Sequence, residues 1–126
     1  MTGDTTLDTT ANDGTIDFSA KIDSSSATNN SLTLKSDGGS ITVHGVIGGT
    51  NDIGALAIND DLNGAGTITL SGVGGDGQVG ITGSVDIGHT STAGIDLAGS
   101  YYNIDGATTL TTTTGANKVD IKVAQT

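Results

Sequence analysis

Cysteine, proline, glutamate and arginine are all missing from this chain of 126 residues. Without cysteine there is no disulfide framework, no thiol nucleophile and no zinc–thiolate site. Without proline every residue keeps its backbone N–H, so a ladder of β hydrogen bonds can run without interruption. Glutamate and arginine favour helices, whereas the 21 glycines and 22 threonines that dominate the chain favour turns and strands. We therefore predict an all-β protein.

Positive charge and aromatic rings are also scarce. Four lysines stand against 14 aspartates, which gives a formal net charge of −10. This charge repels phosphate groups and anionic membrane surfaces. Phe18, Tyr101 and Tyr102 are the only rings, too few to stack a series of bases. We expect no nucleic-acid partner, and the lack of an apolar run of about 18 residues predicts no direct membrane insertion.

What the chain does contain is a repeated pattern of about 25 residues. Its clearest marker is a pair of apolar residues two positions apart with a polar residue between them, which places both apolar side chains on one face of a strand. The pair occurs five times, as Ile16 and Phe18, Ile41 and Val43, Ile68 and Leu70, Ile95 and Leu97, and Val119 and Ile121.

A second pair and a third apolar element recur in step with this marker. The second pair consists of Leu32 and Leu34, Leu56 and Ile58, Val85 and Ile87, and more weakly Thr108 and Leu110, with Leu7 in a partial opening repeat. The third element is less regular and comprises Ile22, then Val46, Ile47 and Ile53, then Val73, Val79 and Ile81, then Tyr101, Tyr102 and Ile104. Three apolar elements per repeat suggest a turn with three sides.

We predict one right-handed parallel β-helix, or β-solenoid, that spans residues 1–126. It would have about five rungs, at approximately 4–30, 31–55, 56–83, 84–107 and 108–126. An antiparallel β-sandwich is the alternative, because strand spacing alone is compatible with it. The near-constant register of similar residues favours the solenoid, since a sandwich gives no reason for every second strand to look alike.

The repeats resemble those of very large bacterial surface proteins. The segments GDTTLDTTANDGTIDF at 3–18 and GSITVHGVIGGTNDIGALAIND at 39–60 are similar to repeats of filamentous-haemagglutinin-like and autotransporter-type adhesins. The resemblance covers residues 3–123 and concerns the pattern of the repeat. It implies a long β-helical shaft, export through an outer membrane, and a role in attachment, aggregation or a protective surface layer.

These observations predict a structural and adhesive repeat segment of an extracellular surface protein or filament. Its location would be the cell surface, with the export signal outside this segment, because residues 1–10 do not have the pattern of a signal peptide. The expected partners are other copies or neighbouring repeats that stack end to end, and host or cell-surface carbohydrate or protein. A calcium-dependent or carbohydrate-binding β-helix domain is the alternative.

We do not expect an enzyme. His44 and His89 are the only imidazoles, lie in different repeats, and have no serine and aspartate at the spacing of a catalytic triad. His44 follows an inward-facing position and should point to solvent. A pair of aspartates could in principle serve a glycosidase, although 14 aspartates bring some pair together by chance.

Cofactors are not expected, but one segment is a weak calcium candidate. Asn59, Asp61 and Asn63, followed by Gly64, match the first half of an oxygen-ligand calcium loop. The position that should supply a bidentate glutamate is Leu70, an inward strand residue. A turn-forming cluster of asparagine and aspartate explains the same residues and is the interpretation we favour.

Overall fold

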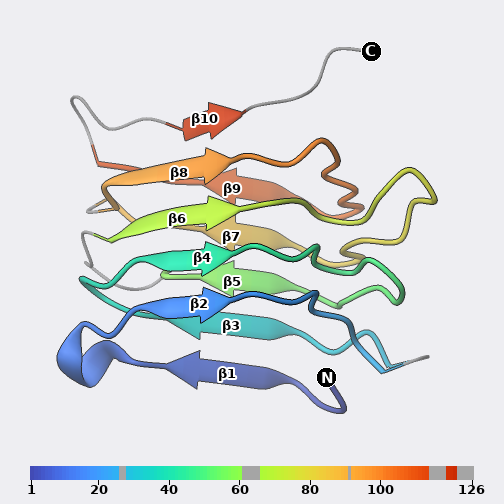
Figure 1. Ribbon diagram of the computed structural model, residues 1–126, viewed down its shortest axis with the longest axis horizontal. Coiled ribbons are helices and arrows are strands. Elements are labelled where there is room, and N and C mark those ends of the chain that lie inside the picture. Colours follow the sequence, from blue (N-terminus) through green and yellow to red (C-terminus); the bar gives the residue numbers. More distant parts are fainter. Residues whose placement is uncertain (26–27, 61–65, 91, 114–118, 122–126) are drawn as a thin grey trace.

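The protein is a β-solenoid, as the sequence predicts (Figure 1). The computed structural model describes residues 1–25, 28–60, 66–90, 92–113 and 119–121. Two five-stranded sheets run along the stack, and they contain alternate strands of the chain. The first sheet consists of β1 (Thr5–Asp8), β3 (Leu32–Lys35), β5 (Leu56–Ile58), β7 (Val85–Ile87) and β9 (Thr108–Leu110). The second consists of β2 (Ile16–Phe18), β4 (Ile41–Val43), β6 (Thr67–Leu70), β8 (Gly94–Leu97) and β10 (Val119–Ile121).

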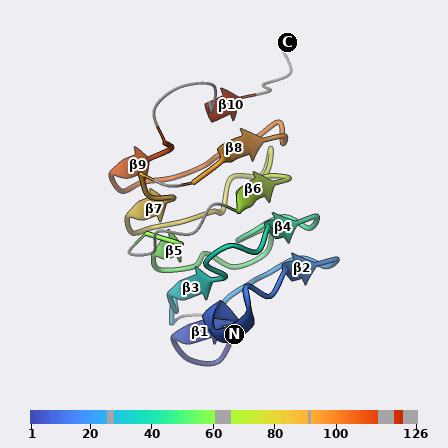
Figure 2. The ribbon, with the colours of Figure 1, turned by 90° about the vertical axis from the view of Figure 1, so that its left-hand side faces the viewer.

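All eight strand pairs in the two sheets are parallel, and each joins a strand to the one a full repeat later. The chain therefore winds through about four turns, with β1 and β10 at opposite ends of the stack (Figure 2). The register places like residues above one another, for example Ile41 beside Ile68 and Ile68 beside Ile95. This parallel in-register pairing excludes the antiparallel sandwich.

The third side of each turn is held by single bridges where the other two sides have strands. One column joins Ile22, Ile47, Val73 and Tyr102, and another joins Ile53, Ile81 and Ile104. Most of the third apolar element of the sequence therefore lies where a three-sided turn requires it, whereas Val46 and Val79 lie outside these columns. Tyr101 and Tyr102 separate here, because adjacent residues face opposite ways: Tyr102 packs against the core, while Tyr101 is exposed.

The hydrophobic residues that are buried in the described part of the chain are all aliphatic, and Ser36, Asn59 and Thr92 are the fully buried polar residues there. In β3 to β8 the paired apolar residues of the sequence pattern point inward and the residue between them is less buried, as in the buried–intermediate–buried pattern of β4, β5 and β7. At the ends of the stack the pattern weakens, because Phe18 is only half-buried and Thr108 is exposed. The buried set is Ile16, Ile22, Leu32, Leu34, Ile41, Val43, Ile47, Ile53, Leu56, Ile58, Ile68, Leu70, Val73, Ile81, Val85, Ile87, Ile95 and Leu97. Each such side chain contributes about 1.5–3 kcal/mol when fully buried.

Burial decreases at the first rung. Leu7 lies in the same column as Leu34, which is completely buried, yet 39% of the Leu7 side chain is exposed. The reason is that β1 pairs with β3 on one edge and has no strand on the other among the described residues. A residue of this column is buried only when rungs cover it from both sides.

Glycine is required at corners where the backbone of one rung lies directly against the backbone of the next rung. Gly48 has a φ of 67°, and a Cβ atom there would lie 2.2 Å from the carbonyl oxygen of Gly80. A Cβ on Gly66 would lie 2.0 Å from the carbonyl oxygen of Gly39 in the rung below. Backbone packs directly on backbone at these corners, which explains part of the high glycine content.

We predict that Ile68→Lys lowers the free energy of unfolding by more than about 3 kcal/mol, because it places a charge in the closed aliphatic column. The matched change Thr69→Lys should stay within about 0.5 kcal/mol, since Thr69 faces outward beside Asp96. Urea unfolding followed by circular dichroism measures both. Equal effects of the two substitutions would contradict the inward and outward assignment.

Candidate functional site

The calcium candidate Asn59 lies inside the solenoid. Its side chain is completely buried, and its backbone has a φ of 48° in the left-handed region that asparagine tolerates. The Asn59 Oδ1 atom accepts a hydrogen bond of 2.8 Å from the backbone N–H of Ser36, and Nδ2 donates one of 3.2 Å to Ser36 Oγ. Asp61 and Asn63 lie outside the described residues. Asn59 therefore serves to connect two rungs at a turn.

The two histidines lie in separate places. His44 is exposed, as its position after β4 predicts, and its Nε2 atom is 3.5 Å from Asp17 Oδ1 in the rung below. His89 makes local bonds instead: its backbone N–H donates to Thr92 Oγ1 at 2.9 Å, and its Nδ1 atom lies 3.1 Å from Thr90 Oγ1. The structure thus does not bring the two imidazoles together.

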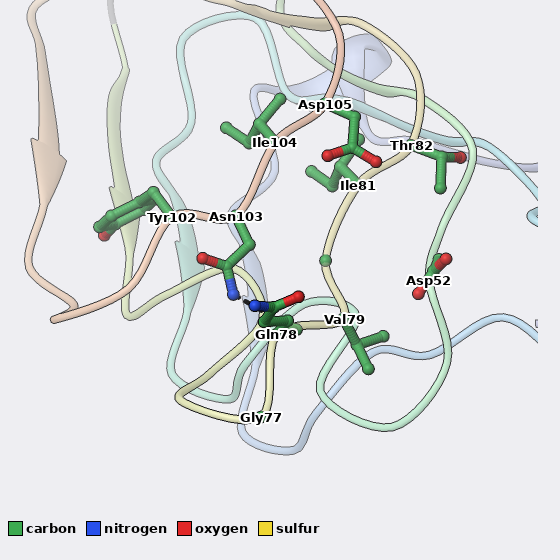
Figure 3. Close-up of a pocket in the computed structure, with 11 residues that line it drawn as sticks. Asp52, Gly77, Gln78, Val79, Ile81, Thr82, Tyr102, Asn103, Ile104 and Asp105 are labelled. Atoms are coloured by element: carbon green, nitrogen blue, oxygen red, sulfur yellow. Dashed lines mark hydrogen bonds between the residues drawn. The ribbon is translucent and has the colours of Figure 1, made fainter.

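The third side carries a lateral cavity of about 630 Å³ (Figure 3). It arises because the rungs differ in length here. Seven residues, 74–80, separate the bridge residues of one rung, and five, 48–52, separate those of the rung before it. In the next rung Asn103 alone spans the same gap. The two longer loops therefore project beyond the straight segment at Asn103.

Polar groups line much of this lateral cavity, including the side chains of Asp52, Gln78, Thr82, Asn103 and Asp105. The lining offers hydrogen-bond donors and acceptors together with negative charge. Such a surface suits hydroxyl-rich or cationic molecules and repels anions. No lysine is among the described residues of the lining.

Asn103 also fixes the shape of the longer loop. Its Nδ2 group donates to the carbonyl oxygens of Gly75 and Gln78, at 2.9 and 2.7 Å. These two residues form an antiparallel bridge at the base of the loop, so Asn103 holds a small hairpin from the next rung. The sequence gives no local sign of this role, because the partners lie 25 and 28 residues away.

Tyr102 closes the inner wall next to the lateral cavity. Its hydroxyl group donates to the carbonyl oxygen of Leu70 at 2.8 Å and accepts from the N–H of Gly99 at 2.9 Å. Burial raises the pKa of this hydroxyl above its ordinary value. Tyr102 is therefore a neutral, structural hydrogen-bonding group near pH 7.

Asp23 performs a similar task for the loop at 48–52. Its Oδ1 atom accepts from the N–H groups of Thr50 and Asn51, at 2.8 and 3.3 Å, and Oδ2 lies 3.1 Å from the Lys21 ammonium group. Burial acts to raise the pKa of Asp23, but these donors outweigh it and hold the pKa below its ordinary value. The ionised carboxylate thus anchors the loop to the rung below.

A second hollow lies inside the tube near β9. This end cavity of about 450 Å³ is lined mostly by core side chains, among them Val85, Ile87, Leu97, Ile104 and Leu110. Thr108 takes the place in this rung that Leu32, Leu56 and Val85 take in the rungs below. Thr108 is exposed there, and β9 is the end strand of its sheet among the described residues, so this position is not filled by a buried aliphatic side chain.

Neither a metal-binding cluster nor a membrane-spanning helix is found among the described residues. The described residues contain no group of three or more histidine, cysteine, aspartate or glutamate side chains able to hold a metal ion. Nor does any helix in the same residues have the length and apolar character needed to cross a membrane.

Comparison with protein-family models, curated proteins and solved structures finds no match to this chain.

We predict that Asn59→Ala lowers the free energy of unfolding by about 2–3 kcal/mol, because it orphans the Ser36 N–H and puts alanine in the left-handed region. Asn59→Gly should cost less, since glycine tolerates this φ.

Thermal unfolding in millimolar calcium and in excess chelator should give the same midpoint for the unaltered chain. A calcium-dependent rise that Asn59→Ala abolishes would instead make Asn59 a ligand.

We also predict an acid-sensitive contribution from Asp23. Because its folded pKa is lowered, the carboxylate stabilises the fold above the unfolded pKa of about 3.9, and this stabilisation is lost as the pH falls through the folded pKa. Asp23→Ala should therefore cost about 1 kcal/mol at pH 7 and progressively less below pH 4. Asp52→Ala, in the anchored loop, is the control for loss of one negative charge. A cost of Asp23→Ala that stays constant with pH would contradict this role.

Proposed function

We propose that the chain is a structural and adhesive repeat segment of a bacterial extracellular surface protein or filament. The observation that carries the proposal is the constant parallel register of successive rungs through both five-stranded sheets. Such a stack has no natural limit to its length, because each rung offers the next one the same edge. Length and surface, rather than a pocket for chemistry, would then perform the function.

The properties of the rung support a role as a stiff shaft. The five strands of each sheet, at the spacing of paired strands, give a stack about 24 Å high, and further rungs would lengthen it into a rod. Backbone hydrogen bonds join the rungs along the axis, for example from the Ile16 N–H to the Ser40 carbonyl and from the Leu56 N–H to the Ser84 carbonyl, both 3.0 Å. The aliphatic columns inside prevent one rung from sliding over the next, because a slip would move apolar residues outward.

The polar and acidic outer surface supports the proposal that the chain is exposed to water outside the cell. The positions between the inward pairs of β2, β4, β6 and β8 are Asp17, Thr42, Thr69 and Asp96. The chain as a whole is strongly acidic, which keeps such rods soluble and apart from one another sideways. The lack of cysteine suits a surface protein that is stabilised by repetition instead of disulfides, and the resemblance to surface adhesins points the same way.

The proposal predicts that two copies joined in tandem fold as one continuous rod. Nine residues would lie between β10 of the first copy and β1 of the second, close to the ten between β8 and β9. We expect small-angle X-ray scattering to give a rod of about 48 Å and unfolding to be one transition at a higher midpoint than the single copy.

A matched pair of variants tests the junction in this tandem. Leu7→Lys in the second copy places a charge at the junction, whereas Leu7→Lys in the first copy places the same charge at the free end. Only the former should shorten the rod and lower the midpoint. Two independent domains with the single-copy midpoint in the unaltered tandem would contradict a role as a continuous shaft segment.

A further inference from the structure

The N-terminal end of the stack has an open edge with an apolar side chain. Among the described residues, β1 and β2 each pair with one strand only, so their outer edges present free N–H and C=O groups. Leu7 of β1 and Tyr101 are the two large hydrophobic residues that are exposed in the described part of the chain. Leu7 continues the buried column of Leu34, Ile58 and Ile87, and so it lacks only a covering rung.

The opposite end has a matching edge. In the described chain β9 pairs only with β7, and β10 pairs only with β8. The column that contains Leu7 at one end contains Leu110 at the other, and the neighbouring column has Thr5 at one end and Thr108 at the other. The end cavity lies beneath this second edge, where Thr108 and Leu110 form part of its lining.

The two edges can pair without rotating one copy relative to the other. Since all strands of a sheet are parallel, a shift of one copy along the axis places its β1 over β9 of the next and its β2 over β10. The register within the chain would then put Thr5 on Thr108, Leu7 on Leu110 and Ile16 on Val119. This contact would continue the same rung-to-rung interface that forms the body of the protein.

We propose that separate copies of this chain bind head to tail, with the β1–β2 edge of one copy on the β9–β10 edge of another. The inference rests on the proposed shaft function and names a second copy as the partner of the open ends. Because the two edges are different surfaces, the contact does not close on itself, and repeated association gives a linear filament.

Charge sets the conditions under which this association occurs. Each copy has a net charge of −10, and Asp4, Asp8 and Asp17 lie exposed at the N-terminal end. Repulsion between copies therefore opposes the apolar contact and the new hydrogen bonds. Salt screens repulsion between exposed charges over a Debye length of about 10 Å at 0.1 M, so the filament forms more readily as the salt concentration rises.

The experiment compares the 126-residue chain with two variants of equal charge. Leu7→Lys places a cation at the centre of the contact, whereas Thr6→Lys places it on the outer face, in the outward column of Thr33 and Ala57. Sedimentation velocity and negative-stain electron microscopy are carried out over a range of protein concentrations, at 20 mM and 500 mM sodium chloride. Circular dichroism confirms that both variants remain folded, which we expect because Leu7 is already partly exposed.

We expect linear assemblies of the unaltered chain that grow with protein concentration and with salt. Leu7→Lys should raise the concentration needed for assembly by at least tenfold, and Thr6→Lys should leave it nearly unchanged. A species that stops at the dimer would indicate that like ends pair, and would overturn the head-to-tail arrangement. Equal loss of assembly in both variants would also overturn it.

The tandem experiment separates this proposal from the proposed function. If the tandem forms one rod while single copies remain monomers at every concentration and salt level, intermolecular stacking is refuted and the shaft function stands. If the tandem also behaves as two separate domains, both are refuted. Assembly of single copies that Leu7→Lys prevents supports the two together.

Discussion

Parallel pairing of each rung with the next, in one constant register, is the constraint on which the structure depends. It gathers equivalent side chains into columns, so the same few aliphatic residues recur wherever the chain passes a given side. It requires a backbone N–H at the paired positions of every strand, which is consistent with a chain without proline. It also brings backbones so close at the corners that some of them accept only glycine. The recurring aliphatic residues, the lack of proline and part of the glycine content thus follow from the parallel pairing of the rungs.

The stability of such a stack is local along its axis. Each rung contacts the rungs before and after it, and contributions from distant rungs do not reach it. A side chain such as Leu34 is fully enclosed because it has neighbours on both sides, whereas Leu7 in the same column is not. Polar residues at the third side add bonds between adjacent rungs, as Asp23 and Asn103 do. The connections on this side differ in length while the bridge columns on either side of them stay aligned.

The sequence predicted the two sheets almost residue by residue, because period-two pairs that recur every 25 residues or so leave little freedom in placing the strands. The third side was predictable only in outline. Its columns are single residues separated by loops of unequal length, so no period identifies that Tyr102 and not Tyr101 faces inward. The interior position of Asn59 was also beyond the sequence, since its partner Ser36 lies 23 residues away and the same letters describe an exposed turn. The hollow beneath the loops near Asn103 depends on three rungs at once, which no local pattern reports.

The direction of the hydrogen bonds between rungs has a mechanical consequence. Because these bonds lie along the axis of the stack, and β1 and β10 are at its two ends, a force that pulls the ends apart loads the bonds of one rung at a time (Figure 1). The rod would then lengthen by peeling, with each released turn supplying about 25 residues of extended chain before the next one opens. In the proposed shaft, such peeling would absorb work over a long extension at nearly constant force.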